Sequence, residues 1–311
     1  MGSSILIIAF FLGFISHYSI QKNFIRYKKF DDFNHRSSHK TLATRTGGIG
    51  IFLTVLVISL YYYFQKIELF DYSLFIPLAI MFVIGVYDDL YNADFKLKFF
   101  LQIIVAKILI DQGYVISNYH GLFGFYEVPW VIAQLSTVFV FLVVVNAINF
   151  IDGIDGLAIT EVIKVILIIE FSSNDYTYIA PLGFLVITSI LPLYYYNFKK
   201  KRKVFLGDSG SMLLGTLVMI YSLYSLGEQY NFRPGLALNK TLFIILVLIY
   251  PLVDLLRVFI LRIKDGSSPF VADQNHIHHY LSLNKKFSPV KTILFINAVS
   301  VLILFSFLIL F

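Results

Sequence analysis

Long apolar runs alternate with short polar segments along the whole chain. A helix that crosses a membrane needs about 20 mostly apolar residues, and ten of these runs reach or approach that length. The runs cover residues 4–20, 47–64, 74–87, 97–111, 130–148, 156–171, 177–196, 210–227, 241–261 and 291–311. The pattern predicts an all-α polytopic membrane protein with about 10 transmembrane helices, or 11 if one run is split.

Lysine and arginine are distributed unevenly over the polar segments between these runs. Segments 21–46, 88–96, 149–155, 197–209 and 262–290 together hold seventeen of them, whereas the alternate segments hold three. Because basic residues accumulate in cytoplasmic loops, the former segments are predicted to face the cytoplasm, with the N-terminus outside. The first run lacks a basic leader and a small-residue cleavage site, so we expect a retained helix and not a signal peptide.

The amino-acid composition supports a membrane protein and narrows its chemistry. Hydrophobic residues make up 58% of the chain, charged residues only 14%, and the mean hydropathy is +0.77. A soluble domain is about a quarter charged, so that class is excluded. Cysteine is absent, which rules out disulfides and thiolate metal sites. No polar segment is long enough for a soluble domain, and we expect one integral-membrane domain over residues 1–311.

Five polar clusters stand out, and all lie in or beside segments predicted to face the cytoplasm. Their sequences are HRSSHKTLATRTGG (35–48), GVYDDLYNADFKLK (85–98), NAINFIDGIDG (146–156), NFKKKRKVFLGDSGS (197–211) and RIKDGSSPFVADQNHIHHYL (262–281). Most have an ordinary explanation when taken alone, because Asp-Gly pairs form turns and basic runs orient loops and attract anionic membrane lipid. Their convergence on one face favours an active site there.

The residue types in these clusters indicate a metal-dependent reaction of a phosphorylated substrate. Carboxylates without cysteine suit Mg²⁺ or Mn²⁺, and Mg²⁺ usually takes one or two carboxylates together with phosphate oxygens of the substrate. Lysine, arginine and histidine nearby suit a polyphosphate, whose transfer depends on positioning and charge neutralisation. From the residues alone we therefore expect an enzyme that acts on a nucleotide-activated substrate at the membrane surface.

Four motifs, NAINFIDGIDGLA, GVYDDLYNADFKLK, VFLGDSGSMLLG and NHIHHYL, resemble those of the polyprenyl-phosphate N-acetylhexosamine-1-phosphate transferases, the MraY–WecA family. The HIHH segment is similar to the WecA-like branch. The resemblance implies an enzyme of the bacterial cytoplasmic (inner) membrane that transfers GlcNAc-1-phosphate from a UDP-sugar to undecaprenyl phosphate and releases UMP. It further implies Mg²⁺ or Mn²⁺ as cofactor and a place at the first membrane step of a cell-envelope glycan.

The resemblance also implies roles for individual residues. The implied catalytic residues are Asp88, Asp89 and Asp152, and the implied metal ligands are Asp208, Asn149 and Asp89. The residues implied to bind the nucleotide or the rest of the substrate are Asp155, Phe205, Asn197, Lys96, Arg262, His276, His278, His279 and Lys40. Because adjacent residues of a helix diverge by about 100°, we expect His276 and His279 to face the substrate and His278 to be more structural.

Other interpretations stay open at this point. An MraY-like peptidoglycan precursor transferase would use the same chemistry. An ion-coupled transporter would carry its charges near the middle of the bilayer, and a di-iron hydroxylase would need more histidine boxes than seven histidines provide. The sequence leaves open the UDP-N-acetylhexosamine used, the later glycan, a one-step or two-step route, and a homodimer. No nucleic-acid partner is expected.

Overall fold

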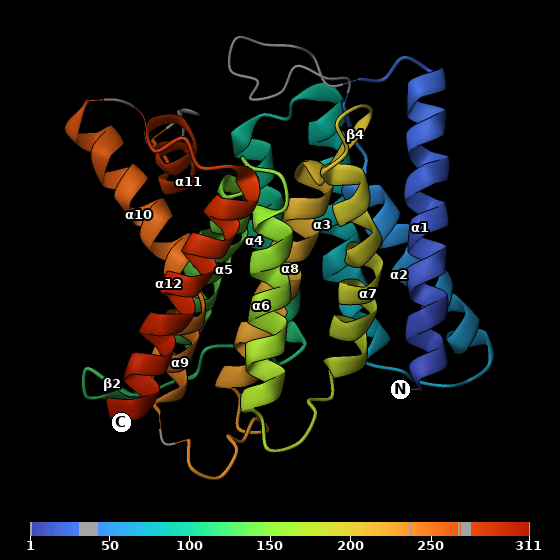
Figure 1. Cartoon of the computed structure of the whole chain (residues 1–311). Helices are drawn as coiled ribbons and strands as arrows, with labels where there is room; N and C mark the ends of the chain where they lie inside the picture. The colour runs from blue at the N-terminus through green and yellow to red at the C-terminus, as the bar shows by residue number, and fades with distance from the viewer. Residues whose placement is uncertain (1, 31–42, 237, 267, 269–274, 311) are drawn as a thin grey trace. The chain divides into compact units, whose positions relative to one another are not determined.

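The computed structural model describes residues 2–30, 43–236, 238–266, 268 and 275–310, and over these residues the chain is mostly helical (Figure 1). The long helices are α1 (Ser3–Arg26), α2 (Gly47–Phe64), α3 (Phe75–Tyr91), α4 (Phe95–Asp111), α5 (Trp130–Phe150), α6 (Leu157–Ser172), α7 (Ala180–Asn197), α8 (Gly207–Leu226), α9 (Lys240–Val247), α10 (Ile249–Lys264) and α12 (Pro289–Leu310). Short helical turns form at η1 (Tyr72–Leu74), α11 (Ile277–His279) and η2 (Tyr280–Asn284). The chain divides into two compact units, residues 1–101 with 178–217 and residues 102–177 with 218–311.

In the first unit, α2 and α3 approach the start of α8 closely at glycines. A Cβ atom at Gly48 of α2 would lie 2.1 Å from the backbone nitrogen of Gly210. A Cβ atom at Gly85 of α3 would lie 2.3 Å from the Asp208 carbonyl oxygen. Because small residues let helices pack backbone to backbone, these two glycines set the position at which α8 begins.

Two short parallel strands of the first unit, β1 (Ala43–Arg45) and β4 (Lys203–Phe205), pair with each other directly before α2 and α8. Gln21 of α1 donates to the carbonyl oxygen that precedes β4 at 2.6 Å. Asn197, the last residue of α7, donates to the middle carbonyl oxygen of β4 at 2.9 Å. Side chains from two helices therefore hold the strand that leads into α8.

The second unit contains a hairpin of β2 (Asn118–Leu122) and β3 (Phe125–Glu127) and a broken helix. α9 and α10 meet at an angle of 72° around Leu248. Pro251 lies at the third position of α10, where it has no N–H to offer the Val247 carbonyl oxygen and its ring clashes with that group. The break therefore has a local cause in the sequence.

The ten apolar runs each coincide with helix, although the run 241–261 is divided between α9 and α10. Within the described residues, six helical segments are long and apolar enough to cross a membrane, and the bent α9–α10 pair would make a seventh. These findings support a mostly helical polytopic membrane protein. The count of 10 or 11 crossings, the outside N-terminus and the single domain over 1–311 stay predictions, and the four short strands were not predicted.

Candidate active site

The turn between α3 and α4 fixes the first acid of the acidic pair, Asp88. Asn92 ends α3 in the left-handed conformation (φ 53°), which asparagine adopts more readily than most residues. Its N–H donates to the Asp88 carbonyl oxygen at 2.9 Å, and the N–H of Ala93 donates to the Asp88 carboxylate at 2.6 Å. One oxygen of this carboxylate is therefore held by the turn, and the other stays available for a cation.

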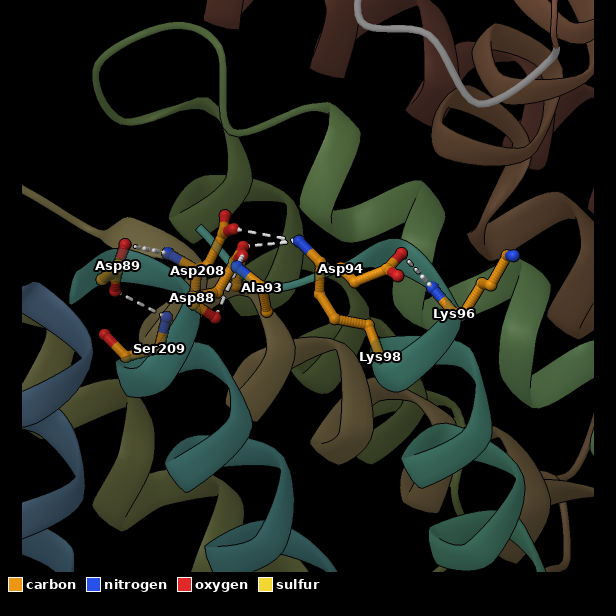
Figure 2. Close-up of polar contacts among 9 residues, drawn as sticks. Asp88, Asp89, Ala93, Asp94, Lys96, Lys98, Asp208 and Ser209 are labelled. Carbon is orange, nitrogen blue, oxygen red and sulfur yellow. Dashed lines mark hydrogen bonds and ion pairs between the residues drawn. The ribbon is translucent and has the colours of Figure 1, made fainter. Parts of the chain in front are cut away.

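Asp88, Lys98 and Asp208 form the polar centre of the first unit (Figure 2). The Lys98 Nζ lies 2.5 Å from an oxygen of Asp88 and 3.6 Å from an oxygen of Asp208. The Asp88 side chain is 8% exposed, whereas the Lys98 and Asp208 side chains are 21% and 31% exposed. Two carboxylates from distant parts of the sequence thus converge on one cation that solvent and ligands can reach.

Asp89, the second acid of the pair, has a different position from Asp88. One of its oxygens accepts the N–H of Asp208 and the other accepts the N–H of Ser209, both at 2.9 Å (Figure 2). These N–H groups belong to the first turn of α8, which has no earlier carbonyl oxygens to bind. Asp89 therefore caps α8 and fixes the backbone that carries Asp208, while its predicted catalytic and metal-binding roles stay predictions.

Lys98, and not Lys96, is the lysine that faces these acids. Asp94 accepts the Lys96 N–H at 3.1 Å at the start of α4, and Figure 2 shows the Lys96 ammonium pointing away from Asp88 and Asp208. Residues two apart on a helix are separated by about 200°, so Lys96 and Lys98 face opposite sides. The sequence prediction named Lys96 as a substrate-binding residue and did not name Lys98. Recognising Asp94 as the N-cap would have fixed the start of α4 and shown that Lys96 and Lys98 lie on opposite faces.

Phe205 and Asn197 lie at the same end of this unit, beside the start of α8. The register of β1 and β4 places Phe205 opposite Arg45. A Cβ atom at Gly207 (φ +74°) would lie 2.7 Å from Asp89 and 3.1 Å from the Arg45 Cβ, so Arg45 is close to the cap of α8. Asn197 acts here through its bond to β4. Lys40 lies outside the described residues.

In the second unit, the loop between α5 and α6 lies against the HIHH segment. Asp152 and Asp155 lie in this loop and Asn149 lies in the last turn of α5, and each is partly exposed. A Cβ atom at Gly153 would lie 2.5 Å from the Nε2 of His278 and 3.3 Å from the Nε2 of His279. The close approach explains the need for glycine at this position and brings two predicted binding segments together. Asn149 and Asp208 belong to different units, so their joint binding of a metal stays a prediction.

The HIHH segment is held by α10 through two side chains one turn apart. Asp254 accepts a hydrogen bond from the His276 Nδ1 at 2.9 Å, and the Tyr250 hydroxyl lies 3.2 Å from the His278 Nδ1. Asp254 and His278 are fully buried and His276 is 5% exposed. Sequence reasoning missed Asp254, although an acid inside an apolar run is a functional candidate by its cost of burial.

The geometry of the histidines differs from the helical arrangement that we expected. His276 has extended backbone (φ −64°, ψ 150°) and precedes α11, so the 100° rule does not apply to it. Its ring stacks on that of His278, with centroids 5.3 Å apart and planes 15° apart, while His279 is partly exposed. Burial lowers the pKa of His278 well below its usual value, and the charges of His279 and His276 lower it further.

Arg262 is placed beside these histidines by an aromatic ring. Its guanidinium lies 5.9 Å from the centroid of Phe150 at the end of α5, and the same ring is 5.8 Å from that of His276. Arg262 is 5% exposed. Packing as well as charged partners therefore fixes the direction of its guanidinium. A cation over an aromatic face is stabilised by about 0.5–2 kcal/mol.

The side chains of the two clusters differ in how well they suit a metal ion as ligands. In the first unit, Asp88 and Asp208 supply hard oxygen ligands around a position where Lys98 already supplies positive charge, which fits Mg²⁺ or Mn²⁺ with substrate phosphates. In the second unit, ligand atoms of Asp254, His276 and His278 lie within 4.8 Å of one another. Imidazole-rich sets do not suit Mg²⁺, and the hydrogen bonds to α10 account for that arrangement.

Comparisons with known proteins assign this chain's relatives to one activity. Residues 71–226 match the family described as glycosyl transferase family 4. The chain is 31% identical over 269 residues to the undecaprenyl-phosphate alpha-N-acetylglucosaminyl 1-phosphate transferase of Haemophilus influenzae, which covers 81% of this chain and 71% of the relative. It is 32% identical over 272 residues to the decaprenyl-phosphate N-acetylglucosaminephosphotransferase of Mycobacterium tuberculosis, covering 79% and 67%.

A third relative has the same activity in its name. The undecaprenyl-phosphate alpha-N-acetylglucosaminyl 1-phosphate transferase of Salmonella typhi is 26% identical over 263 residues, which cover 80% of this chain and 68% of the relative. The region 71–226 contains the Asp88–Lys98–Asp208 cluster and the loop between α5 and α6. The names of the three relatives agree on the sugar phosphate and differ in the length of the lipid.

Proposed function

This chain belongs to glycosyl transferase family 4, and from this premise we propose that it transfers GlcNAc-1-phosphate from UDP-GlcNAc to undecaprenyl phosphate and releases UMP. Its relatives are named for the transfer of this sugar phosphate to a polyprenyl phosphate, and the chain is a transferase of that kind. The UDP donor, the undecaprenyl chain and a place at the first membrane step of a cell-envelope glycan belong to the proposal.

The observation that carries the proposal is the convergence of Asp88 and Asp208 on Lys98. A pyrophosphate donor and a phosphate acceptor bring several negative charges to one place, and such a reaction needs cations held in fixed positions. Bound there, Mg²⁺ or Mn²⁺ would be held by Asp208 and would offset the charge of the donor pyrophosphate. The acids lie at the ends of long apolar helices, whereas an ion-coupled transporter carries its coupling residues near the middle of the bilayer.

The transfer step proposed here forms one bond and breaks one. An oxygen of the lipid phosphate attacks the β-phosphorus of UDP-GlcNAc, the bond from that phosphorus to the bridging oxygen breaks, and the electron pair leaves with UMP. Asp88 holds or accepts the proton of the acceptor phosphate, whose second pKa near 6 requires only a weak base. Lys98, which shares the Asp88 carboxylate, contacts the phosphate oxygens.

The remaining predicted residues bind the donor in this proposal. Phe205 stacks on the uracil and Asp155 accepts a hydrogen bond from it, with Asn197 holding β4 in place. Arg262, His276 and His279 donate to the pyrophosphate as its charge grows, which stabilises the transition state. His278 supports its neighbours, because it is fully buried. Asp152, Asn149, Asp89 and Lys96 stay candidates for the same site.

The proposal places the reaction on the cytoplasmic side of the bacterial inner membrane. The support is the excess of lysine and arginine in the segments that carry the polar clusters. UDP-sugars are made in the cytoplasm, and the lipid acceptor reaches the site from the bilayer. A homodimer stays an open alternative.

A panel of UDP-sugars tests the proposal. We expect the purified chain in lipid nanodiscs with undecaprenyl phosphate and Mg²⁺ to release UMP from UDP-GlcNAc at least tenfold faster than from UDP-GalNAc or UDP-glucose. Omission of the lipid should abolish UMP release in a one-step route. Release of UDP instead of UMP, or no reaction with any UDP-N-acetylhexosamine, would contradict it.

A further inference from the structure

α10 presents two polar side chains to the HIHH segment from the interior of the second unit. Asp254 and Tyr250 lie one turn apart and reach His276 and His278 respectively. Asp254 is fully buried, and it lies in a helix that is otherwise rich in apolar residues. Burial of a carboxylate costs free energy unless hydrogen bonds or charges compensate it. The groups that bind Asp254 therefore indicate its role.

Both oxygens of Asp254 accept hydrogen bonds from the start of the HIHH segment. Oδ2 accepts from the His276 Nδ1 at 2.9 Å, and Oδ1 accepts from the Ile277 backbone N–H at 2.8 Å. An ionised carboxylate only accepts, so the His276 Nδ1 carries a proton. The nitrogen left for any other partner is Nε2, which can donate only when the ring holds a second proton as an imidazolium.

Two ring contacts restrict the orientation of the His276 ring, and Arg257 holds the groups on either side of it. The His276 ring stacks on His278 at 5.3 Å, and His278 is held by Tyr250. The Phe150 ring lies 5.8 Å away with Arg262 on it. Arg257 approaches Asp254 at 4.0 Å and donates to the carbonyl oxygen just before His276 at 2.5 Å. The ring is therefore held on several sides before any substrate binds.

We propose that Asp254 is a positioning residue that holds His276 as an imidazolium, with Nδ1–H toward α10 and Nε2–H toward the substrate pyrophosphate. The inference rests on the proposed function, because the substrate gives Nε2–H its partner. Asp254 touches no substrate itself. It acts by limiting rotation of the His276 ring and by offsetting the charge of the imidazolium, so that a donor is in place when charge develops on the phosphate.

The change Asp254→Asn tests this directly, because an amide has one accepting oxygen for two donors. If that oxygen accepts from the Ile277 N–H, the amide NH₂ faces His276 and forces its proton to Nε2. In full-length protein labelled with ¹⁵N-histidine in nanodiscs with UDP-GlcNAc bound, we expect both ring nitrogens of His276 to be protonated in the wild type and Nε2 alone in the variant. His276→Gln assigns the signal by removing it.

Kinetics provide the second readout. We expect Asp254→Asn to lower kcat about 100-fold and to change the KM for UDP-GlcNAc less than about threefold. The double variant Asp254→Asn/His276→Gln should be no slower than His276→Gln alone, because a positioning residue acts only through its partner. A merely structural Asp254 would give additive losses and unchanged protonation of the His276 ring.

Glu170→Gln is the matched control. Glu170 is a buried carboxylate of α6 in the same unit, and it accepts from the backbone N–H and the hydroxyl of Thr177 at 3.1 and 2.5 Å. The change Glu170→Gln removes the same charge from a similarly buried position, and we expect this variant to keep a normal kcat.

The outcomes separate the inference from the proposed function. A wild-type His276 protonated only at Nε2 overturns the inference without any variant, so a misfolded Asp254→Asn protein does not remove the test. An active wild type with an equally active Asp254→Asn variant also overturns it. A wild-type chain that transfers no sugar phosphate contradicts the proposed function, and in that case the protonation of the His276 Nδ1 alone decides whether Asp254 holds the ring.

Discussion

The two polar clusters hold their acids in opposite ways. In the first unit, Asp88 and Asp208 face Lys98, a flexible side chain that is 21% exposed. In the second unit, Asp254 is fully buried and both of its oxygens are bound, to a ring nitrogen and to a backbone N–H. The first arrangement can exchange one cation for another, whereas the second is fixed before substrate arrives.

In the proposed reaction the two clusters would have different tasks. A metal with its bound pyrophosphate would enter and leave in every cycle, so its ligands would need a partner that can move away. A hydrogen-bond donor to the transition state works best when it is oriented in advance. The following changes therefore have their largest expected effects in the exchangeable cluster and smaller effects where side chains only frame the substrate.

The largest effect is expected from Asp208→Asn. The amide keeps the size of the side chain but removes the charge that would hold a divalent cation, and we expect kcat to fall about 1000-fold, within the several kcal/mol that a metal contributes. Turnover is measured at limiting and saturating Mg²⁺, with Asp111→Asn as the control, because Asp111 is an exposed acid that forms an ion pair with Lys107. Near-normal turnover at limiting Mg²⁺ would remove the assignment.

Lys98→Met should have the next largest effect. We expect kcat to fall about 100-fold, as for the loss of one donor to a developing anion. The concentration of Mg²⁺ at half-maximal rate should fall several-fold, because two carboxylates lose their resident counter-charge. The matched change is Lys107→Met on the same helix, which breaks an exposed ion pair. An unchanged Mg²⁺ dependence would mean that Lys98 does not compete with the metal.

Phe205→Ala should mainly weaken donor binding. An aromatic contact adds about 0.5–1.5 kcal/mol beyond its buried area, which corresponds to about a 2- to 12-fold rise in the KM for UDP-GlcNAc. The KM for undecaprenyl phosphate should stay within about twofold. If the donor KM were unchanged in a normally expressed protein, Phe205 would be a packing residue of β4 and not a base-stacking one.

The smallest effect concerns stability and the buried His278. Its pKa is lowered by burial, so the unfolded chain binds a proton that the folded chain does not. Stability should therefore fall as pH drops below the ordinary histidine pKa near 6.5, with a slope of at most about 1.4 kcal/mol per pH unit from this residue. His278→Gln should flatten the dependence of Tm between pH 7 and pH 5. An identical slope in both proteins would contradict the neutral state of His278.

Hydropathy predicted the helices because each apolar run is long, and it failed where the structure depends on short-range geometry. The bend at Leu248 was hidden because 241–261 was treated as one apolar run, although Pro251 lies in its middle and proline is unfavourable inside a helix. β1 and β4 have three residues each, too few for a periodic pattern. Their pairing depends on side chains from α1 and α7, which no local pattern indicates.

The candidate site shows the same limit. Asp88 and Asp208 were predicted because their motifs resemble those of the family, and the structure brings them to one lysine. Lys98 was missed because its direction depends on where α4 begins. Asp254 was missed because it lies within a predicted membrane span, and its partner His276 is brought to it only by tertiary structure.

The position of the transferred phosphorus tests the central claim most directly. Purified chain in nanodiscs is given undecaprenyl phosphate, Mg²⁺ and UDP-GlcNAc labelled with ³²P at the β-phosphate, and lipid and water-soluble products are separated. Transfer of GlcNAc-1-phosphate predicts that the label appears in the lipid fraction in equal amount to the UMP released, and that Asp208→Asn abolishes both. Label that remains in water-soluble UDP while sugar enters the lipid would show transfer of the sugar alone and would contradict the account.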